Sequence, residues 1–314
     1  MPRRLVLVFG SYMQDQVYRC AEFPVPGQTV KGTLATGPGG KGSNQAIAAG
    51  RIGAATLFVG AVGADGPGRD AATIYRREKI GCKLVVKAGV PTGTAGIWVN
   101  GRGTNEIIIA PGANEQLAAK DVSDRELKSA AIVVTQLEGD PKAVATVLKR
   151  ARKLGATTVL NPAPLVANLD LRLLRAVDVL IPNETEFVGL MDRFNRELDE
   201  ATLAALSPEE VHTLCRALGV PTVVVTLGAR GCLVSTAERY EFLPAHRGVK
   251  VVDTTGAGDA FCGGFAAGFV RYQRDVFAAA RLGNAVAALS VTAAGAAPSM
   301  PTAKAVAKLL GRRL

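Results

Sequence analysis

The sequence predicts an α/β protein with a doubly wound, mainly parallel sheet flanked by helices, and a small β-sheet lid. Two observations carry this expectation. Continuous apolar runs such as residues 5–9, which end in glycine and polar residues, are typical of strands buried on both faces. From residue 131 onward such runs alternate with helical segments, which is the order expected of parallel strands joined by helices.

Composition narrows the class of protein. The 314 residues are 48% hydrophobic and 20% charged, which is ordinary for a globular protein. We expect one domain over residues 1–314, with lid segments inserted at approximately 14–36 and 94–110. No apolar run reaches the roughly 18 residues that a membrane span requires. The 5 scattered cysteines form no C-x-x-C pair, so a reducing cytoplasm is expected, and with 2 histidines acid–base chemistry falls to carboxylates or lysines.

The net charge of +10 raises the question of a nucleic-acid partner. The basic residues are dispersed among acidic ones, and only 5% of residues are aromatic, without interleaving of the two kinds. Nucleic acid is therefore not expected as a partner, and the positive surface is better explained as solvated or as steering anionic substrates.

The first half of the chain predicts part of the sheet and the lid. Strands are expected at 5–9, 54–59 and 83–86, and helices at 46–51 and 70–79. Segments 94–99 and 105–109 flank an Asn-Gly turn and predict a hairpin. Together with short strands within residues 20–36, this apolar hairpin would form the lid and a surface for a homodimer.

The second half predicts the rest of the sheet. Further strands are expected at 131–134, 157–160, 177–181 and 222–226, and helices at 141–154, 277–294 and from 302. Pro141 suits the first turn of its helix. The stretch 193–210 is acidic and expected at the surface.

Polar residues follow several of these strands at their carboxyl ends: Asp15, Glu138, Asn183 with Glu186, and Thr226 with Gly228. Because the carboxyl ends of parallel strands share one edge of a sheet, these residues predict a single ligand cleft.

A glycine-rich loop at residues 37–45 precedes a predicted helix. Its glycines match G-x-G-x-x-G, but neither a core strand before the loop nor a later acidic residue supports a dinucleotide site. It is not a P-loop either, since Gly42 stands where Ser or Thr should follow Lys41. The loop brings Lys41 and Asn44 to a helix N-terminus, where they can hold a polar or anionic ligand.

Residues 251–261 combine small residues and glycines with the start of a helix, and Asp259 lies at that start. Free N–H groups at a helix N-terminus bind anions, and glycines let an anion approach the backbone. A carboxylate beside such a site can accept the proton of an alcohol during phosphoryl transfer. Taken alone, Asp259 is more readily explained as a helix cap. The polar residues at the other strand ends favour the catalytic interpretation.

Two separated motifs carry a family resemblance. The segments Gly39-Gly40-Lys41-Gly42-Ser43-Asn44 and Asp253-Thr254-Thr255-Gly256-Ala257-Gly258-Asp259 resemble the two signatures of the ribokinase-like (PfkB) carbohydrate kinases. Between them, Gln136-Leu137-Glu138, Asn161-Pro162-Ala163, Pro182-Asn183-Glu184-Thr185-Glu186 and Thr226-Leu227-Gly228 occur in the family's order. The resemblance spans residues 10–301 and is greatest to the ribokinases. It implies a ribokinase-like fold and ATP-dependent phosphorylation of a sugar's terminal hydroxyl.

The resemblance also implies roles for individual residues. Asp259 would be the base, and Gly256, Ala257 and Gly258 would form the anion hole. The sugar would lie against Met13, Asp15, Gly40, Lys41, Gly42, Asn44, Glu138 and Asp259. ATP would lie along Asn183, Thr226, Gly228, Gly231, Gly258 and Asn284, and Glu186 would act on Mg²⁺-linked waters and phosphates. A monovalent cation, K⁺ in ribokinases, would bind at Asp253, Thr255, Ser290, Ala293, Gly295 and Ser299.

Met13 departs from the family pattern. Ribokinases typically carry Asn two residues before the sugar-binding Asp, and losing one sugar hydrogen bond costs about 1 kcal/mol. D-ribose is the expected substrate, with fructose, deoxyribose, ketodeoxygluconate and nucleosides as alternatives. A nucleoside would require aromatic stacking, for which Tyr12 and Trp98 are the candidates. A non-catalytic sugar- or nucleotide-binding regulator is disfavoured, because its motifs would be degraded and here they are intact. A Rossmann dehydrogenase is disfavoured because the sequence lacks the acidic residue that binds the ribose of the cofactor.

Overall fold

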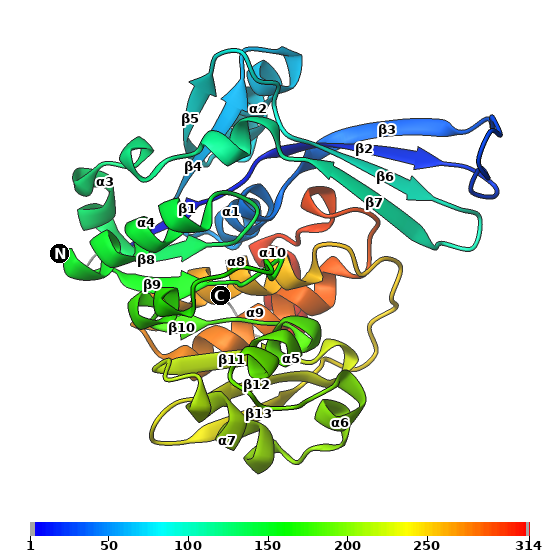
Figure 1. Ribbon diagram of the computed structural model, residues 1–314. Helices are drawn as coiled ribbons and strands as arrows, with labels where there is room; N and C mark the ends of the chain where they lie inside the picture. The colour runs from blue at the N-terminus through cyan, green and yellow to red at the C-terminus, as the bar shows by residue number, and fades with distance from the viewer. Residues whose placement is uncertain (1–3, 312–313) are drawn as a thin grey trace.

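The computed structural model describes residues 4–311 and 314, which contain two separate β-sheets (Figure 1). The larger sheet has nine strands in the order β13-β12-β11-β10-β9-β8-β1-β4-β5. These strands are β1 (Leu5–Phe9), β4 (Thr56–Gly63), β5 (Gly81–Lys87), β8 (Ala130–Thr135), β9 (Thr157–Leu160), β10 (Val179–Leu180), β11 (Thr222–Thr226), β12 (Gly231–Ser235) and β13 (Tyr240–Pro244). All pairings from β5 through β11 are parallel, and β12 and β13 add an antiparallel edge.

Helices cover both faces of this sheet, and sheet and helices together are called the body. One face packs against α1 (Lys41–Arg51), α2 (Gly66–Arg77), α8 (Ala257–Arg271), α9 (Val276–Ser290) and α10 (Ala303–Leu309). The opposite face packs against α3 (Asp124–Ser129), α4 (Pro141–Lys153), α5 (Glu184–Arg193), α6 (Glu200–Ala205) and α7 (Pro208–Ala217). In β1, Val6 and Val8 point into the first layer while Leu7 and Phe9 point into the second, which explains its uninterrupted apolar sequence.

The smaller sheet, called the lid, projects from one end of the body (Figure 1). Its strands lie in the order β3-β2-β6-β7, with β2 and β6 parallel and the outer pairs antiparallel. They are β2 (Met13–Arg19), β3 (Thr33–Gly39), β6 (Thr94–Val99) and β7 (Asn105–Ala110). The predicted lid and its hairpin are thus present, but the short strands expected within residues 20–36 are largely wrong. The only strand in that stretch is β3, which starts at Thr33 and runs on to Gly39, and β2 lies before it and contains Asp15, which was expected after a strand end.

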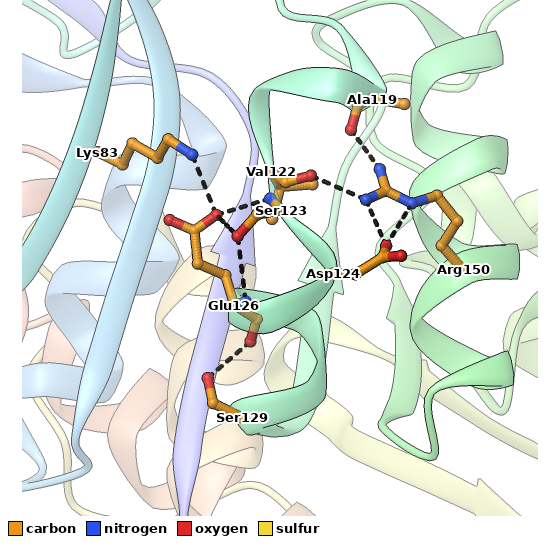
Figure 2. Close-up of polar contacts among 8 residues, drawn as sticks. All are labelled: Lys83, Ala119, Val122, Ser123, Asp124, Glu126, Ser129 and Arg150. Atoms are coloured by element: carbon orange, nitrogen blue, oxygen red, sulfur yellow. Dashed lines mark hydrogen bonds and ion pairs between the residues drawn. The ribbon is translucent and has the colours of Figure 1, made fainter.

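The chain returns from the lid to β8 through η1 (Gly112–Gln116), η2 (Ala119–Asp121) and α3. Arg150 of α4 donates to the Val122 carbonyl at 3.0 Å and to Asp124 at 2.6 Å, and it also bonds the Ala119 carbonyl (Figure 2). On the other side, Lys83 of β5 pairs with Glu126 at 3.1 Å. This segment is therefore anchored to both neighbouring elements of the body.

Several predicted boundaries are wrong. The helix expected at 46–51 begins at Lys41, because the chain turns at Gly40 (φ 85°) and the helix starts directly after it. The helix expected at 277–294 ends at Ser290, since small residues there continue into a turn. The strand expected at 54–59 runs from Thr56 to Gly63, and the one at 177–181 shrinks to Val179–Leu180.

The acidic stretch 193–210 was predicted only as surface, but it contains α6 and begins α7. Strands β12 and β13 were not predicted, while β9 and β11 match their predicted bounds. Of the helices in the described part of the chain, none is long and apolar enough to cross a membrane.

Candidate active site

Asp259 lies in the first turn of α8. This helix begins directly after Gly256, whose backbone is left-handed (φ 77°). Its side chain is only 6% exposed. Asn44 donates its amide to Oδ2 at 2.9 Å, and Gln45 donates its amide to Oδ1 at 2.9 Å. Because each oxygen accepts from a different carboxamide of α1, the orientation of the carboxylate is set. The α8 N-terminus also favours its negative charge.

A chain of carboxamides holds Gln45 in turn. The Gln45 carbonyl accepts from the Gln136 amide at 2.6 Å, and the Gln45 amide also reaches the Asn161 carbonyl at 3.2 Å. Asn161 donates to the Ile181 carbonyl at 2.9 Å. Gln45 is thus a site residue that sequence reasoning did not single out, although it directly follows Asn44 in the glycine-rich motif.

Glu138 and Lys41 meet at the start of α1. Glu138 Oε2 accepts from the Ser11 hydroxyl and, at 2.8 Å, from the Lys41 backbone N–H. Burial by itself lowers the pKa of the Lys41 ammonium, but the carboxylates of Asp259, Glu138 and Glu186 outweigh it and leave that pKa raised. One ammonium group is therefore stabilised by the charges of three carboxylates that come from distant parts of the sequence.

Asp15 reaches the same place from lid strand β2. A Cβ on Gly39 would lie 1.9 Å from Asp15 Oδ1, so only glycine in β3 leaves room for this carboxylate. Burial, followed by the charges of Glu138 and Asp259, raises the pKa of the Asp15 carboxyl to about 7. The lid thus brings Asp15 within electrostatic reach of both body carboxylates.

Met13 lies two residues before Asp15 in β2 and therefore on the same face of that strand. It is 2% exposed and, with Glu138 and the lid residue Ile109, lines a cavity of 470 Å³. Met13, where ribokinases typically carry Asn, thus places a thioether beside the site and offers no hydrogen-bond donor.

The predicted anion hole follows a loop, residues 251–255, that faces the lid. Gly256 and Ala257 are partly buried, Gly258 is exposed, and nothing lies within 4 Å of a Cβ built on Gly258. A cavity of 370 Å³ lies between the lid and the loops at 251–255 and 294–296, and Asp15 lines it. An anion at the start of α8 would therefore lie between Asp259 and open space.

The predicted ATP residues surround the ends of β10, β11 and β12. Asn183 caps α5, accepting from the Glu186 N–H at 2.8 Å, while Glu186 accepts from the Asn183 N–H at 2.9 Å. Burial raises the pKa of the Glu186 carboxyl, with the Asp259 charge adding to this and the Asn183 N–H and Lys41 opposing it. The remaining members lie at the end of β11 (Thr226), in the turn to β12 (Gly228), at the first residue of β12 (Gly231), on α8 (Gly258) and on α9 (Asn284). Of these, Asn284 donates its amide to the Pro244 carbonyl.

The predicted cation residues lie on two adjoining loops. Asp253 accepts from the Thr255 N–H at 2.9 Å and from the Gly295 N–H at 2.8 Å, which joins residues 253–255 to residues 290–299. Ser290 and Ser299 donate to the carbonyls of Ala287 and Ala296, and Ala293 follows Ser290 in the same turn. Within residues 4–311 and 314, no group of three or more His, Cys, Asp and Glu residues is arranged to hold a metal ion. Backbone carbonyls and hydroxyls are the oxygen ligands this region offers, and they suit a hard cation.

A cavity of 780 Å³ lies elsewhere in the described part of the chain. It lies beside Arg4, Ala131, Phe269 and Arg274, at the opposite ends of the strands from Asp259. Convergence of carboxylates, carboxamides and a helix N-terminus, rather than volume, therefore distinguishes the site described above.

Comparison with known proteins agrees with this geometry. The model of the pfkB family carbohydrate kinases matches residues 3–303. The chain is 34% identical over 304 residues to the ribokinase of Haemophilus influenzae, with 96% of each chain covered. It is also 34% identical over 303 residues to the deoxyribokinase of Salmonella typhi, with 95% of each covered. The structure of Arabidopsis thaliana ribokinase complexed with ribose and ATP matches with a TM-score of 0.84 and 30% identity over 99% of both chains.

The fold and these relatives define a phosphotransferase that acts on an alcohol group. The chain belongs to the pfkB family of carbohydrate kinases and is a ribokinase-like sugar kinase. The family resemblance and the fold class predicted from the sequence are both confirmed.

Proposed function

We propose that this kinase transfers the γ-phosphoryl group of ATP to the 5-hydroxyl of D-ribose and releases ribose 5-phosphate. The observation that carries the proposal is the geometry of Asp259. It is a buried carboxylate at a helix N-terminus, oriented by Asn44 and Gln45 and within electrostatic reach of Asp15 on the lid. The ribose and ATP in the structure of the Arabidopsis relative support the choice of substrates.

In this mechanism Asp259 accepts the proton of the sugar hydroxyl as that oxygen attacks phosphorus. The N–H groups at the start of α8, from Gly256 to Gly258, stabilise the charge on the transferred phosphoryl group. Lys41, held charged by three neighbouring carboxylates, adds positive charge beside the reacting oxygens. Since no histidine takes part, the carboxylate alone performs the acid–base step.

The sugar is held by polar groups that still have free capacity. The carbonyl oxygen of Asn44 is buried and has no hydrogen-bond partner among the described residues. A sugar hydroxyl would satisfy it, and a buried acceptor otherwise left unpaired costs about 1–3 kcal/mol. Asp15 and Glu138 supply carboxylate oxygens that accept from further hydroxyls.

Mg²⁺ and a monovalent cation fit the groups present. Mg²⁺ usually binds through one or two carboxylates, water and the substrate phosphates, and Glu186 is a buried carboxylate on the ATP side of Asp259. Mg²⁺ bound beside Glu186 would neutralise charge on the phosphates of ATP. K⁺ would bind the carbonyl-rich loops joined by Asp253, where it would support the anion hole.

An ATP-consumption assay tests the proposal. D-ribose should give turnover, with ribose 5-phosphate identified by NMR, and K⁺ should increase the rate. Fructose, ketodeoxygluconate and nucleosides serve as comparison acceptors. Turnover with a nucleoside and not with ribose would overturn the proposal, and no turnover with any acceptor would favour a binding protein.

A second candidate substrate is 2-deoxy-D-ribose, and Met13 is the observation that favours it. A buried thioether beside Glu138 stabilises a sugar carbon that lacks a hydroxyl and cannot pair one that carries it. The Salmonella deoxyribokinase is as similar to this chain as the Haemophilus ribokinase. Comparing kcat/KM for the two sugars in the wild type and in Met13→Asn decides between them. A shift toward ribose in the variant, from a wild type that prefers deoxyribose, would support the second candidate.

We also propose a homodimer formed through the lid. Leu34, Ile107 and Ile108 of the lid are 56%, 49% and 67% exposed in the single chain, and Trp98 lies on the same sheet. Exposed apolar strands of this kind favour association. Sedimentation should show a dimer at micromolar concentration for the wild type and a monomer for Ile108→Glu. A monomeric wild type would reject the proposal.

A further inference from the structure

The lid is joined to the body by four crossings of the chain, and one side chain lies at three of them. The crossings are from β1 to β2, from β3 to α1, from β5 to β6, and from β7 to η1. Asn114 belongs to η1, just after the chain leaves β7, and is 1% exposed. None of the roles considered above uses it.

The carboxamide of Asn114 binds the first and last crossings together. Its carbonyl oxygen accepts from the Tyr12 N–H at 3.0 Å, and its amide donates to the Tyr12 carbonyl at 2.8 Å. The same amide donates to the Pro111 carbonyl at 2.9 Å. Tyr12 directly precedes β2, and Pro111 directly follows β7. The side chain of Asn114 therefore bonds backbone groups where the chain enters the lid and where it leaves it.

The crossing from β5 to β6 passes against the same group. A Cβ on Gly93 would lie 2.3 Å from the Asn114 amide nitrogen and 2.6 Å from the Pro111 carbonyl oxygen. The Gly93 carbonyl in turn accepts from the Gln14 N–H at 2.8 Å, at the start of β2. Gly93 therefore lets the third crossing close around Asn114.

Asp15 is three residues beyond Tyr12 on β2, within a strand whose pairing with β6 begins at Gln14. A rotation of the lid at Tyr12 would carry Asp15 away from Lys41, Glu138 and Asp259, while Asp259 would keep its bonds to Asn44 and Gln45. If the lid rotates at Tyr12, the placement of Asp15 would therefore depend on the bonds of Asn114, and that of Asp259 would not.

We propose that Asn114 is the positioning residue of the lid hinge and sets sugar affinity by holding Asp15 at the site without touching the sugar. The inference rests on the proposed function, because it assumes that Asp15 binds sugar. It requires that loss of Asn114 affects sugar binding more than the phosphoryl-transfer step.

The kinetic test is Asn114→Ala, with Asn100→Ala as the matched control. Asn100 is also a buried lid asparagine whose carbonyl accepts two backbone N–H groups, from Arg102 and Thr104, but it lies in the far hairpin turn. Asn114→Ala should raise the KM for sugar about tenfold or more, with kcat at saturating sugar and the KM for ATP within about twofold. Asn100→Ala should leave all three constants within about twofold. An equal effect of both variants, or a fall in kcat alone, would overturn the proposal.

Amide hydrogen exchange tests the hinge without relying on turnover. In Asn114→Ala, protection of the lid amides of Gln14 and Gln16 should fall about tenfold, while the body strand amides of residues 6–9 keep theirs. Equal loss in lid and body would indicate an ordinary structural role, and no loss in the lid would reject the hinge. If the wild type phosphorylates no sugar, the proposed function fails, and the exchange comparison still decides on the hinge.

If Asn114→Ala does not fold, Asn114→Asp provides the same test. Its carboxylate can still accept from the Tyr12 N–H, but it lies against two carbonyl oxygens that it cannot bond once ionised. At pH 8, where this carboxyl is ionised, the sugar KM should therefore be raised relative to the wild type at the same pH. A KM equal to that of the wild type at pH 8 would overturn the proposal.

Discussion

Asp259 and Asp15 lie within electrostatic reach of each other, but they are held in opposite ways. Each oxygen of Asp259 accepts from a carboxamide of the body. The carboxylate of Asp15, on the lid, accepts no hydrogen bond from any described residue and has a pKa raised to about 7. In the proposed mechanism, the body is thus arranged for phosphoryl transfer before any ligand binds. The lid carries a half-buried carboxylate, and in the proposed function its missing partners would be the hydroxyls of the sugar.

The largest expected effect is on turnover, and it tests the role of Asp259 in the body. Asp259→Asn should lower kcat by at least about a hundredfold, the usual contribution of a positioned base, while sugar and ATP still bind. Steady-state kinetics together with calorimetric titration of both ligands measure the two properties separately. Near-normal turnover in this variant would remove Asp259 from the role of base.

The lid half is tested by the pH dependence of Asp15. Because the ionised carboxylate accepts sugar hydroxyls better than the protonated acid, kcat/KM for sugar should rise with pH through an ionisation near the pKa of about 7. Asp15→Asn should lower kcat/KM about tenfold at pH 8 and remove this ionisation from the profile. An unchanged profile would mean that another group titrates.

The same variant has an expected effect on stability, of known sign. The folded-state pKa of Asp15 is raised from 3.8 to about 7, so the folded protein binds this proton more tightly than the unfolded chain. Its contribution is complete below about pH 4 and is lost as pH rises through 7. Asp15→Asn should therefore gain stability relative to the wild type between pH 5 and pH 8 in chemical denaturation. A constant difference across that range would contradict the raised pKa.

The sequence predicted some residues of this candidate site and missed others. The glycine motifs, Asp259 and the strand-end carboxylates could be found because each is a local pattern with its own chemistry. Gln45, Gln136 and Asn114 could not, since an amide becomes a site residue only through its partner. Gln45 meets Gln136 from 91 residues away, and Asn114 meets Tyr12 from 102. Strands β12 and β13 were missed because an antiparallel edge does not follow the strand–helix alternation that revealed the rest.

Gln45 allows a smaller test of how rigidly the body holds its aspartate. Gln45→Met keeps the approximate size but removes the amide that binds Asp259 Oδ1, and it leaves Gln136 without its acceptor. We expect kcat to fall about tenfold with the sugar KM changed less, because the base loses orientation rather than chemistry. A rise in sugar KM alone would place Gln45 among the sugar-binding groups instead.

The smallest expected effect is on the free energy of unfolding, and it is tested by comparing an arginine of the body with one of the lid. Arg150 binds two backbone carbonyls and Asp124 in the segment that returns from the lid (Figure 2), so Arg150→Ala should lower the free energy of unfolding by about 1–2 kcal/mol. The Arg102 side chain pairs with Glu22, and the two side chains are 73% and 67% exposed, so Arg102→Ala should change stability by less than about 0.5 kcal/mol. Neither variant should alter kcat or KM, because neither arginine contacts the site or the hinge. Chemical denaturation and kinetics on both proteins provide the measurement. A raised sugar KM in Arg150→Ala would show that the return segment, and not Asn114 alone, sets the position of the lid.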